Sequence, residues 1–501
     1  MNMNLNATQV IVFLVLTALI GGLTYLGTRG HRKGVSGEQD YFLAGGSLKW
    51  YFVAGSITLT NLSTDQLIGM NGNQMALLAW WELAAVVGLL MLAFLFIPVY
   101  YRYNCTTTTE LLERRYGNKH IRALISVLFL AGNIFIFLPA ILYGGSLFMQ
   151  QMFGLEHISV WWIALAFALV GSAYAIFGGL RAVAVSDTIS GFLILGLALY
   201  VTWLALSAID FDFSGVPRER LSLIGDFDSP IPFATLFTGM LFIQMFYWST
   251  NQTITQRAMA SPSVGEAQKG ILAAAGIRLL IVPPIIVLPG IVSFKLFGEV
   301  PNNEAYGQIV SALLPAALSG AFAAAIAAAV LTTFNSILNA SAALWVMDIH
   351  ESYIDRNPNV RRLSMWVSVS MVALAFLMFP VFQNGENLIN QIQEYYGYLS
   401  MPILSAFIVG LLFRNVNANA VIISTVFAVA FYAFMVNVYP AWPGGNFIHM
   451  MAIDLVVTVI LALVVNRVVF GQSARWDAHN VFGKGAGDAA LAIDPEAGGA
   501  V

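Results

Sequence analysis

The sequence predicts an all-α, polytopic membrane protein with about 13 membrane-spanning helices. Three observations support this prediction. Of the 501 residues, 58% are hydrophobic and only 10% are charged, whereas an ordinary soluble domain carries about 25% charged residues. The hydrophobic residues gather in long stretches, each close to the ~20 residues that a helix needs to cross a bilayer. Two of these stretches are interrupted near their middle by polar residues.

The predicted spans follow one another through the whole chain. They lie roughly at 8–27, 48–71, 76–100, 121–150, 158–178, 185–208, 233–256, 270–297, 317–347, 363–383, 394–413, 417–439 and 446–469. Several are longer than a straight helix needs to cross the hydrocarbon core, which indicates tilted or broken helices.

Basic residues orient these spans, because cytoplasmic loops carry an excess of lysine and arginine. Most of the 23 basic residues lie in alternate loops on one side, and Arg257 is placed in one of those loops. The exceptions are Arg218, Arg220 and Lys295 on the opposite side, and Arg278 inside the span 270–297. We therefore expect the N-terminus outside and the C-terminus in the cytoplasm.

The second predicted span is interrupted by the polar run from Thr60 to Gln66, in which only Leu62 is apolar. A charge near the bilayer centre costs about 2.5–3.5 kcal/mol, so Asp65 is tolerable there only beside water, a ligand or an ion. Short polar side chains also compete for backbone hydrogen bonds. We expect the helix to break here and to bind a transported solute.

A second interruption lies in the seventh predicted span, five spans further on. Gln244, Tyr247, Trp248 and Asn251 recur there at helical spacing and share one face. Two broken helices at matching positions of two five-helix halves are typical of inverted-repeat transporters, whose site lies between them at the midplane. The alternative interpretation is a pair of Ser/Thr-rich helices joined by interhelical hydrogen bonds.

Single polar residues occur in four further spans. Glu82 follows a tryptophan pair, and the alternative there is an interface belt near the membrane surface. Asp187 begins the sixth span, where the helix dipole also favours an acid. Arg278 stands alone in an apolar run, where it either faces a cavity or extends to the interface. Gln393 opens the eleventh span.

The ninth span is mostly alanine and other small residues, followed by Thr332 and Thr333. Small residues allow helices to approach closely. Hydroxyl groups on such a helix, set against carbonyls released by a broken one, form an all-oxygen site of the kind that hard cations prefer. A monovalent cation such as Na⁺ fits a site with few formal charges. The alternative is that the threonines bond back onto their own helix.

Composition argues against several other classes of protein. The net charge is −3 and no basic face is apparent, so no nucleic-acid partner is expected. The single cysteine, Cys105, excludes an internal disulfide and a cysteine-rich metal site. No motif has the spacing of a nucleophile with its base or of metal ligands, so no enzyme activity is expected. Residues 471–501 are predicted to form a disordered cytoplasmic tail, too short for a signalling domain.

Several short motifs resemble those of the sodium:solute symporter family, and most closely its bacterial sodium–sugar branch. The matching stretches are 40–45, 61–72, 178–180, 256–257, 266–270, 288–290, 347–349 and 392–395, in the family's order. The resemblance implies a LeuT-type fold, with two inverted five-helix repeats plus flanking helices, in the cell (inner) membrane. It also implies import of a solute together with Na⁺ by alternating access.

The resemblance divides the chain into six segments. Residues 1–47 hold an extra span and a cytoplasmic loop, 48–208 the first repeat, 209–232 an external loop, 233–413 the second repeat, 414–470 two C-terminal spans, and 471–501 the tail. The family's sodium site falls on the carbonyls of Leu59, Leu62 and Ala329 and the hydroxyls of Thr332 and Thr333. Asp187 matches an acid that supports sodium binding. A second sodium in some members would involve Asp187, Thr332, Asn335 and Ser336, and it stays open here.

The branch's sugar-binding positions fall on Asn61, Gln66, Glu82, Gln244, Arg278 and Gln393, with Tyr247 stacking beneath the sugar. Met70 and Trp81 match hydrophobic outer gate positions, and Tyr247 is also a gate residue. These residues are what the resemblance implies. Amides and a carboxylate that bond hydroxyl groups, with an aromatic face against the ring, are suited to a polyol.

Two departures from the family pattern keep other solutes open. Arg278 replaces the usual lysine, and Ala85 replaces a serine. Arginine offers a fork for a carboxylate, so an acidic sugar stays open, although Glu82 would oppose an anion. The nearest alternative is a carboxylate, amino acid or inorganic anion, and a remote one is a membrane sensor with this fold. Asp65 has no assigned ligand and is expected to be structural or a gate partner.

Overall fold

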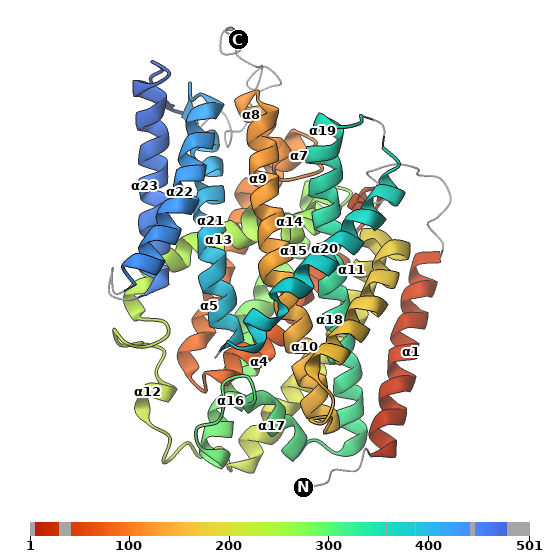
Figure 1. The fold of residues 1–501 in the computed structure, drawn as a ribbon. Coiled ribbons are helices and arrows are strands. Elements are labelled where there is room, and N and C mark those ends of the chain that lie inside the picture. Colours follow the sequence, from red (N-terminus) through yellow and green to blue (C-terminus); the bar gives the residue numbers. More distant parts are fainter. Residues whose placement is uncertain (1–5, 30–41, 357, 386, 441–445, 478–501) are drawn as a thin grey trace.

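The computed structural model describes residues 6–29, 42–356, 358–385, 387–440 and 446–477. These residues are predominantly helical, as predicted (Figure 1). The α-helices are α1 (Ala7–Arg29), α3 (Trp50–Asn61), α4 (Thr64–Gly72), α5 (Trp80–Leu83), α6 (Ala85–Met91), α7 (Ile97–Arg102), α8 (Glu110–Tyr116), α9 (Lys119–Gly132), α10 (Leu138–Phe153), α11 (Val160–Ala208), α12 (Arg218–Leu221), α13 (Gly239–Ser249), α14 (Gln252–Met259), α15 (Val264–Leu280), α16 (Val282–Phe297), α17 (Ala305–Leu313), α18 (Ala316–Ala343), α19 (Glu351–Tyr353), α20 (Val360–Gln383), α21 (Leu388–Leu412), α22 (Ala418–Val438) and α23 (Phe447–Val468).

Other regular segments are short. 3-10 turns lie at Ala44–Gly46, Ala76–Ala79 and Phe233–Phe237, and π-helical turns at Leu92–Phe96, Asn133–Phe137 and Leu344–His350. The strands β1 (Phe413–Arg414) and β2 (Arg475–Trp476) pair antiparallel. π-helical turns within longer helices often occur at functional sites, and one of them contributes to the cavity described below.

Ten helices in the described residues are long and apolar enough to cross a membrane. The two interrupted spans are not among them, because each is divided into two short helices, α3 with α4 and α13 with α14. A single helix, α11, covers the predicted spans 158–178 and 185–208, and its apolar stretches are Val160–Gly171 and Leu180–Ala208. The all-α, membrane-spanning class is confirmed, whereas the total of about 13 spans stays a prediction.

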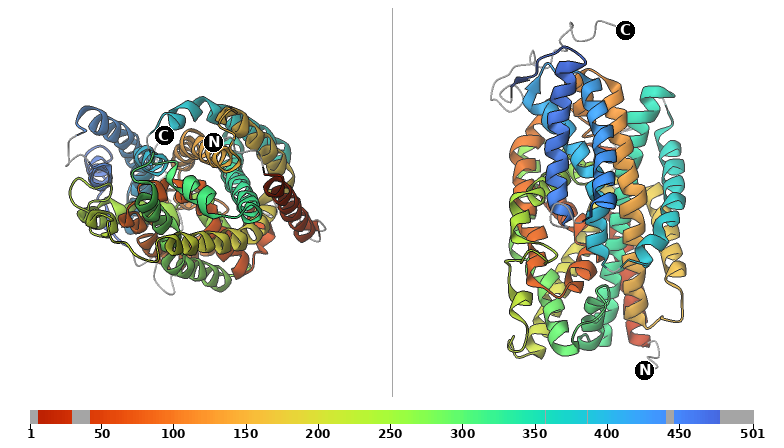
Figure 2. Two further views of the ribbon diagram at one scale, coloured as in Figure 1. Left: turned by 90° about the horizontal axis from the view of Figure 1, so that it is seen from below. Right: turned by 60° about the vertical axis from the view of Figure 1, so that its left-hand side comes forward.

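The helices form one bundle with the two interrupted spans near its middle. α1 begins at one end of the bundle and α23 finishes at the other (Figure 1). Seen along the bundle, α1 and the α22–α23 pair lie on opposite outer edges (Figure 2). α1 packs on α11 and α18, and the α22–α23 pair packs on α21. These three helices therefore flank the other helices of the bundle.

Exposure follows the pattern of a protein surrounded by lipid. Large apolar side chains such as Phe192, Trp162 and Leu377 are among the most exposed of the described residues. Many polar and charged side chains are instead fully buried, including Asp187, Arg257 and Arg278. Polar groups in a membrane protein face the bundle interior, where other side chains or ligands satisfy them. The interior of this bundle is therefore where function is to be sought.

The predicted disordered tail is ordered at its beginning. Trp476 packs edge to face on Phe413, with ring centroids 5.3 Å apart, and Asp477 pairs with Arg414 at 2.8 Å. These contacts explain why the prediction is wrong for the first residues of the segment 471–501. From residue 478 onward, the predicted tail lies outside the described residues, as do positions 30–41 of the first predicted cytoplasmic loop.

Candidate functional site

The second predicted span breaks where its polar run begins. α3 ends at Asn61 and α4 begins at Thr64, and the two residues between them leave helical geometry (φ/ψ of −84°/75° for Leu62 and −120°/−168° for Ser63). The hydroxyl groups of Ser63 and Thr64 are buried and have no hydrogen-bond partner among the described residues. The break therefore leaves oxygen atoms available for a bound ion or solute.

The seventh predicted span breaks at Thr250 and Asn251. The side chain of Asn251 accepts a hydrogen bond from the backbone N–H of Thr253 (2.9 Å) and so caps the start of α14. One turn before this break, the Tyr247 hydroxyl donates to Asn61 Oδ1 at 2.9 Å. The two breaks, 186 residues apart at this bond, therefore lie next to each other in the bundle.

A cavity with about 430 Å³ of empty space lies beside the two breaks. Six of the seven residues predicted to bind the solute line it, as do all three predicted gate residues. Its wall consists of Asn61, Asp65, Gln66, Met70, Trp81, Glu82, Phe137, Ile243, Gln244, Tyr247, Trp248, Ile389, Ile392 and Gln393. The structure thus brings together side chains that the sequence distributes over more than 300 positions.

Arg278 is the predicted binding residue that is not part of this wall. Its guanidinium donates to Glu82 Oε2 and, at 2.8 Å, to the carbonyl of Thr58, and it lies 4.4 Å from the Trp248 ring centroid. Gln66 donates to the other oxygen of Glu82. Both side chains of the ion pair are fully buried. Arg278 therefore compensates the charge of Glu82, and both carboxylate oxygens of Glu82 are engaged.

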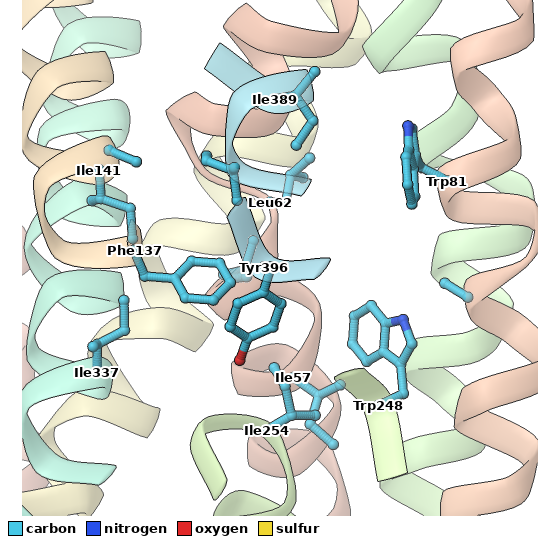
Figure 3. Close-up of a cluster of buried hydrophobic side chains, with 14 of the residues drawn as sticks. Ile57, Leu62, Trp81, Phe137, Ile141, Trp248, Ile254, Ile337, Ile389 and Tyr396 are labelled. Atoms are coloured by element: carbon cyan, nitrogen blue, oxygen red, sulfur yellow. The ribbon is translucent and has the colours of Figure 1, made fainter. Parts of the chain in front are cut away.

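Aromatic side chains lie in the cavity wall (Trp81, Phe137 and Trp248) or behind it (Tyr396, against Phe137). Figure 3 shows Trp81 and Trp248 on one side and Phe137 and Tyr396 on the other. Phe137 meets Tyr396 edge to face, with ring centroids 4.7 Å apart. The amide of Gln244 is held at both ends, because it donates to the Trp81 carbonyl and accepts from Trp248 Nε1, each at 2.8 Å. Flat apolar surfaces next to fixed amides suit a ligand that has both C–H faces and polar groups.

The residues predicted to bind sodium lie on α18 and at the end of α3, and α18 packs against both α3 and α4. The Thr333 hydroxyl is buried and has no hydrogen-bond partner within the part of the chain that the structure describes. The Thr332 hydroxyl instead donates to the carbonyl of Ala329 at 3.1 Å. The back-bonded alternative thus holds for Thr332, whereas Thr333 keeps an oxygen available.

Asp187 is fully buried on α11 and faces α3. Its Oδ2 atom accepts from the hydroxyls of Ser56 (2.6 Å) and Thr60 (3.5 Å). Arg257 lies 3.9 Å from the same oxygen and donates to Ser56 Oγ at 2.7 Å and to the hydroxyl of Ser336. Asp187 is therefore part of a polar network that links α3, α11, α14 and α18.

The placement of Arg257 in a cytoplasmic loop is wrong, because this side chain is fully buried on α14. Its charge is satisfied inside the bundle by Asp187 and by the Thr253 carbonyl. The loop prediction failed because it counted charge alone. Separately, the sequence analysis assigned no role to Phe137, a buried aromatic residue of the cavity wall. The polar residues just before Arg257, at positions 252, 253, 255 and 256, are the sequence signal that its helix faces other protein.

A second cavity, with about 310 Å³ of empty space, adjoins the first. The two cavities share Asn61, Asp65, Phe137 and Tyr247, and the second also includes Thr333. Its other wall residues are Thr60, Asn133, Ile141, Asn251, Thr253 and Ile337. It therefore connects the neighbourhood of the predicted solute residues with that of the predicted sodium residues.

Comparison with known proteins decides the family. The model of the sodium:solute symporter family matches residues 41–427, well over half of the chain. The chain belongs to the sodium:solute symporter family. This symporter is 32% identical over 488 residues to the uncharacterised symporter YidK of Escherichia coli K12, which covers 92% of the chain and 84% of YidK.

Two further relatives carry the names of their solutes. The sodium/glucose cotransporter of Vibrio parahaemolyticus is 30% identical over 468 residues, covering 86% of the symporter described here and 85% of its own length. The mouse sodium/myo-inositol cotransporter 2 is 29% identical over 428 residues, covering 76% of the chain and 63% of its own length.

Solved structures agree on the fold. A Na⁺-coupled sialic acid symporter in a substrate-bound, outward-open state matches with a TM-score of 0.77 at 17% identity, covering 94% of this chain and all of that one. Mhp1, a nucleobase-cation-symport-1 family transporter, matches with a TM-score of 0.57 at 16% identity, covering 85% of this chain and 92% of Mhp1. The fold is that of LeuT-type transporters. The protein is therefore a multi-pass membrane symporter with Na⁺ as coupling ion, and not an enzyme.

Proposed function

We propose that this symporter imports a sugar or sugar derivative together with Na⁺ by alternating access. The observation that carries the proposal is the first cavity, where amides, two carboxylates and a phenol meet between aromatic rings. Gln66 Oε1 and Trp81 Nε1 are buried and lack a hydrogen-bond partner among the described residues. The wall therefore offers both an acceptor and a donor, which is what hydroxyl groups need. The names of two relatives, which refer to glucose and myo-inositol, support the same solute class.

The proposed coupling uses the broken helix α3–α4. Na⁺ binds to the carbonyls of Leu59, Leu62 and Ala329 and to the hydroxyl of Thr333, with Thr332 beside them. This binding fixes α18 against the break, next to Asn61 and Gln66, and so prepares the solute site. The membrane potential supplies about 2.3 kcal/mol per charge at 100 mV, which corresponds to about 40-fold accumulation of a neutral solute per Na⁺.

The proposed movement involves the two halves of the core. We assign residues 48–208 and 233–413 to the two inverted repeats, which place a broken helix from each half beside the cavity. The basic loops favour an N-terminus outside and a C-terminus in the cytoplasm, and the bacterial relatives favour the inner membrane. Met70 and Trp81 are proposed to form the outer gate, and Tyr247 is proposed as a gate residue next to the second cavity.

We propose one Na⁺ per solute. A second ion at Asp187, Thr332, Asn335 and Ser336 would lie beside the guanidinium of Arg257, which already contacts Asp187 and Ser336. Two cations so close inside a low-dielectric bundle repel each other strongly. The expected Hill coefficient for Na⁺ activation of uptake is therefore 1, and a value near 2 at saturating sugar would contradict this stoichiometry.

The test is uptake into proteoliposomes that contain the purified full-length protein. Radiolabelled glucose, galactose, myo-inositol, glucuronate, proline and acetate are offered with an inward Na⁺ gradient, and with K⁺ in place of Na⁺ as the control. Na⁺-dependent accumulation of a sugar or inositol is the expected result. Accumulation of proline or acetate alone would replace the sugar proposal by the amino-acid or carboxylate alternative.

A further inference from the structure

Asp65 is the one acid of the first cavity that the proposed function leaves without a role. It lies in the first turn of α4, directly after the break, and it lines both cavities. Its side chain is 7% exposed, and its Oδ1 atom is buried without a hydrogen-bond partner among the described residues. This oxygen can accept a hydrogen bond from a bound solute, and such a bond would offset the cost of burying it without a donor.

Two other buried acids near the cavities have an arginine beside them, although Asp454 on α23 forms no ion pair among the described residues. Glu82 contacts Arg278, and Asp187 lies next to Arg257. For Asp65, no ion pair occurs within the ranges that the structure describes. Its charge is therefore left for something that enters the cavity.

The charges of the first cavity can be counted from its wall. Asp65 and Glu82 are its two charged wall residues. Arg278 compensates Glu82 from behind, so Asp65 is the acid of this wall whose negative charge, when it is ionised, has no arginine paired with it among the described residues. An anionic solute would be repelled by this charge at short range in a medium of low dielectric constant. A hydroxyl pair or an ammonium group would instead donate to the carboxylate, and such charge-assisted hydrogen bonds are the strong ones.

We propose that the Asp65 carboxylate binds donor groups of the transported solute and makes the site select against acidic solutes. The inference rests on the proposed sugar transport and narrows the substrate class. The substrate is a polyhydroxy compound without a fixed negative charge, and a derivative in which an amino group replaces one hydroxyl group is also accepted. Gln66 is the next residue of the same helix, and Asn61 lies across the break. The donor groups of the solute therefore meet one carboxylate and two amides in the same cavity.

The competing role for Asp65 is binding of Na⁺, since Asp65 and Thr333 share the second cavity. The two roles predict opposite kinetics. A solute ligand changes the KM for sugar at saturating Na⁺ and leaves Na⁺ activation at saturating sugar nearly constant. A sodium ligand changes Na⁺ activation. Thr333→Ala is the matched sodium-side variant, and Asp228→Asn, at an exposed loop position, is the control for loss of one negative charge.

The experiment uses proteoliposomes with the full chain and the best neutral sugar of the wild type, its amino derivative and its uronate. For Asp65→Asn we expect the KM of the neutral sugar to rise about tenfold or more, as for loss of a charge-assisted hydrogen bond. The Na⁺ concentration for half-activation should change by less than about twofold. Uptake of the uronate relative to the neutral sugar should increase, and Asp228→Asn should match the wild type.

Several outcomes overturn the proposal. These are an unchanged sugar KM in Asp65→Asn, a change confined to Na⁺ activation, or a wild type that prefers the uronate to the neutral sugar. In each of these cases Na⁺-coupled sugar uptake by the wild type still stands. If the wild type accumulates no sugar with Na⁺, the proposed function and this inference fail together. If Asp65→Asn does not fold, Asp65→Glu serves instead, because it keeps the charge and moves it by one methylene group. This variant is expected to raise the KM for the neutral sugar while still excluding the uronate. Efficient uptake of the uronate by Asp65→Glu would contradict the proposed selection against acidic solutes.

Discussion

Two buried pairs of arginine and carboxylate lie in the core of this symporter, and they are built differently. Arg278 contacts Glu82 directly, and Gln66 occupies the other oxygen of that carboxylate. Arg257 stands 3.9 Å from Asp187 and reaches it through Ser56, which donates to Asp187 at 2.6 Å. One oxygen of Asp187 has no hydrogen-bond partner in the described part of the chain.

The difference assigns different roles to the two pairs. The Glu82–Arg278 pair is closed, so its charges cancel and it serves as a fixed part of the solute cavity. The Asp187–Arg257 pair is loose, and its acid retains the capacity to attract another cation towards the neighbouring sodium residues. Breaking the closed pair should therefore cost stability, whereas altering the loose pair should mainly cost sodium affinity.

The largest effect is expected for Arg278→Met. The substitution keeps an unbranched apolar stem but leaves Glu82 charged and buried without its cation, which costs about 3–5 kcal/mol. Thermal unfolding of the purified protein in detergent should show a much lower Tm, and uptake should be lost. The double variant Arg278→Met with Glu82→Gln removes both charges, so its Tm should recover in large part. If Arg278→Met alone keeps the Tm of the wild type, the pair is not the closed unit described above.

Asp187→Asn is expected to weaken Na⁺ activation of uptake more than it lowers the stability of the protein. Asparagine still accepts from Ser56, and Arg257 keeps its bonds to Ser336 and the Thr253 carbonyl. Stability should fall by about 1–3 kcal/mol, less than for Arg278→Met. The Na⁺ concentration for half-activation should rise about tenfold, as for the loss of one charge near the ion. The sugar KM at saturating Na⁺ serves as the control, and a change in that KM alone would show that Asp187 serves the solute instead.

How far the sequence predicts this site depends on the kind of residue. Polarity within apolar spans located both breaks, because lipid forbids unsatisfied backbone and side-chain groups. The resemblance then selected six wall residues that the structure places together. What one sequence cannot show is which polar atoms satisfy each other. The interaction of Arg278 with Glu82, and the burial of Arg257, both depend on helices that meet only after folding.

The same limit applies to acids and hydroxyl groups. From the sequence, Asp65 is expected to be structural or a gate partner because no family role falls on it, yet one of its oxygens is buried at the cavity without a hydrogen-bond partner among the described residues. Thr332 and Thr333 are neighbours of the same type, but the first bonds to its own helix and the second does not. Helix geometry turns successive residues by about 100°, so neighbours in sequence face different surroundings.

This difference between the two threonines can be tested directly. Thr333→Ala removes a hydroxyl that has no protein partner in the described residues, so the Na⁺ concentration for half-activation should rise several-fold, by about 3- to 10-fold. Thr332→Ala removes a hydroxyl already bonded to Ala329, and its effect on Na⁺ activation should be smaller. Measuring both by Na⁺-dependent uptake at saturating sugar ranks the two oxygens. Equal effects would mean that the Thr332 hydroxyl gives up its bond to the Ala329 carbonyl when the ion binds. If Thr333→Ala has no effect, Thr333 is not part of the sodium site.

The smallest expected effect concerns the neutral bond that joins the two breaks. Tyr247→Phe removes the hydrogen bond to Asn61 but keeps the ring against the cavity, and a typical neutral hydrogen bond contributes about 0.5–1.5 kcal/mol. The sugar KM should therefore rise about 2- to 10-fold, while Na⁺ activation stays near that of the wild type. Tyr396→Phe is the matched control, because it removes the hydroxyl that accepts from Asn251 at 3.1 Å and lies outside both cavity walls. It should lower the Tm slightly without changing the sugar KM. If the two variants change KM equally, the effect comes from general loosening around the second break, and the bond between Tyr247 and Asn61 has no special role in holding the solute site.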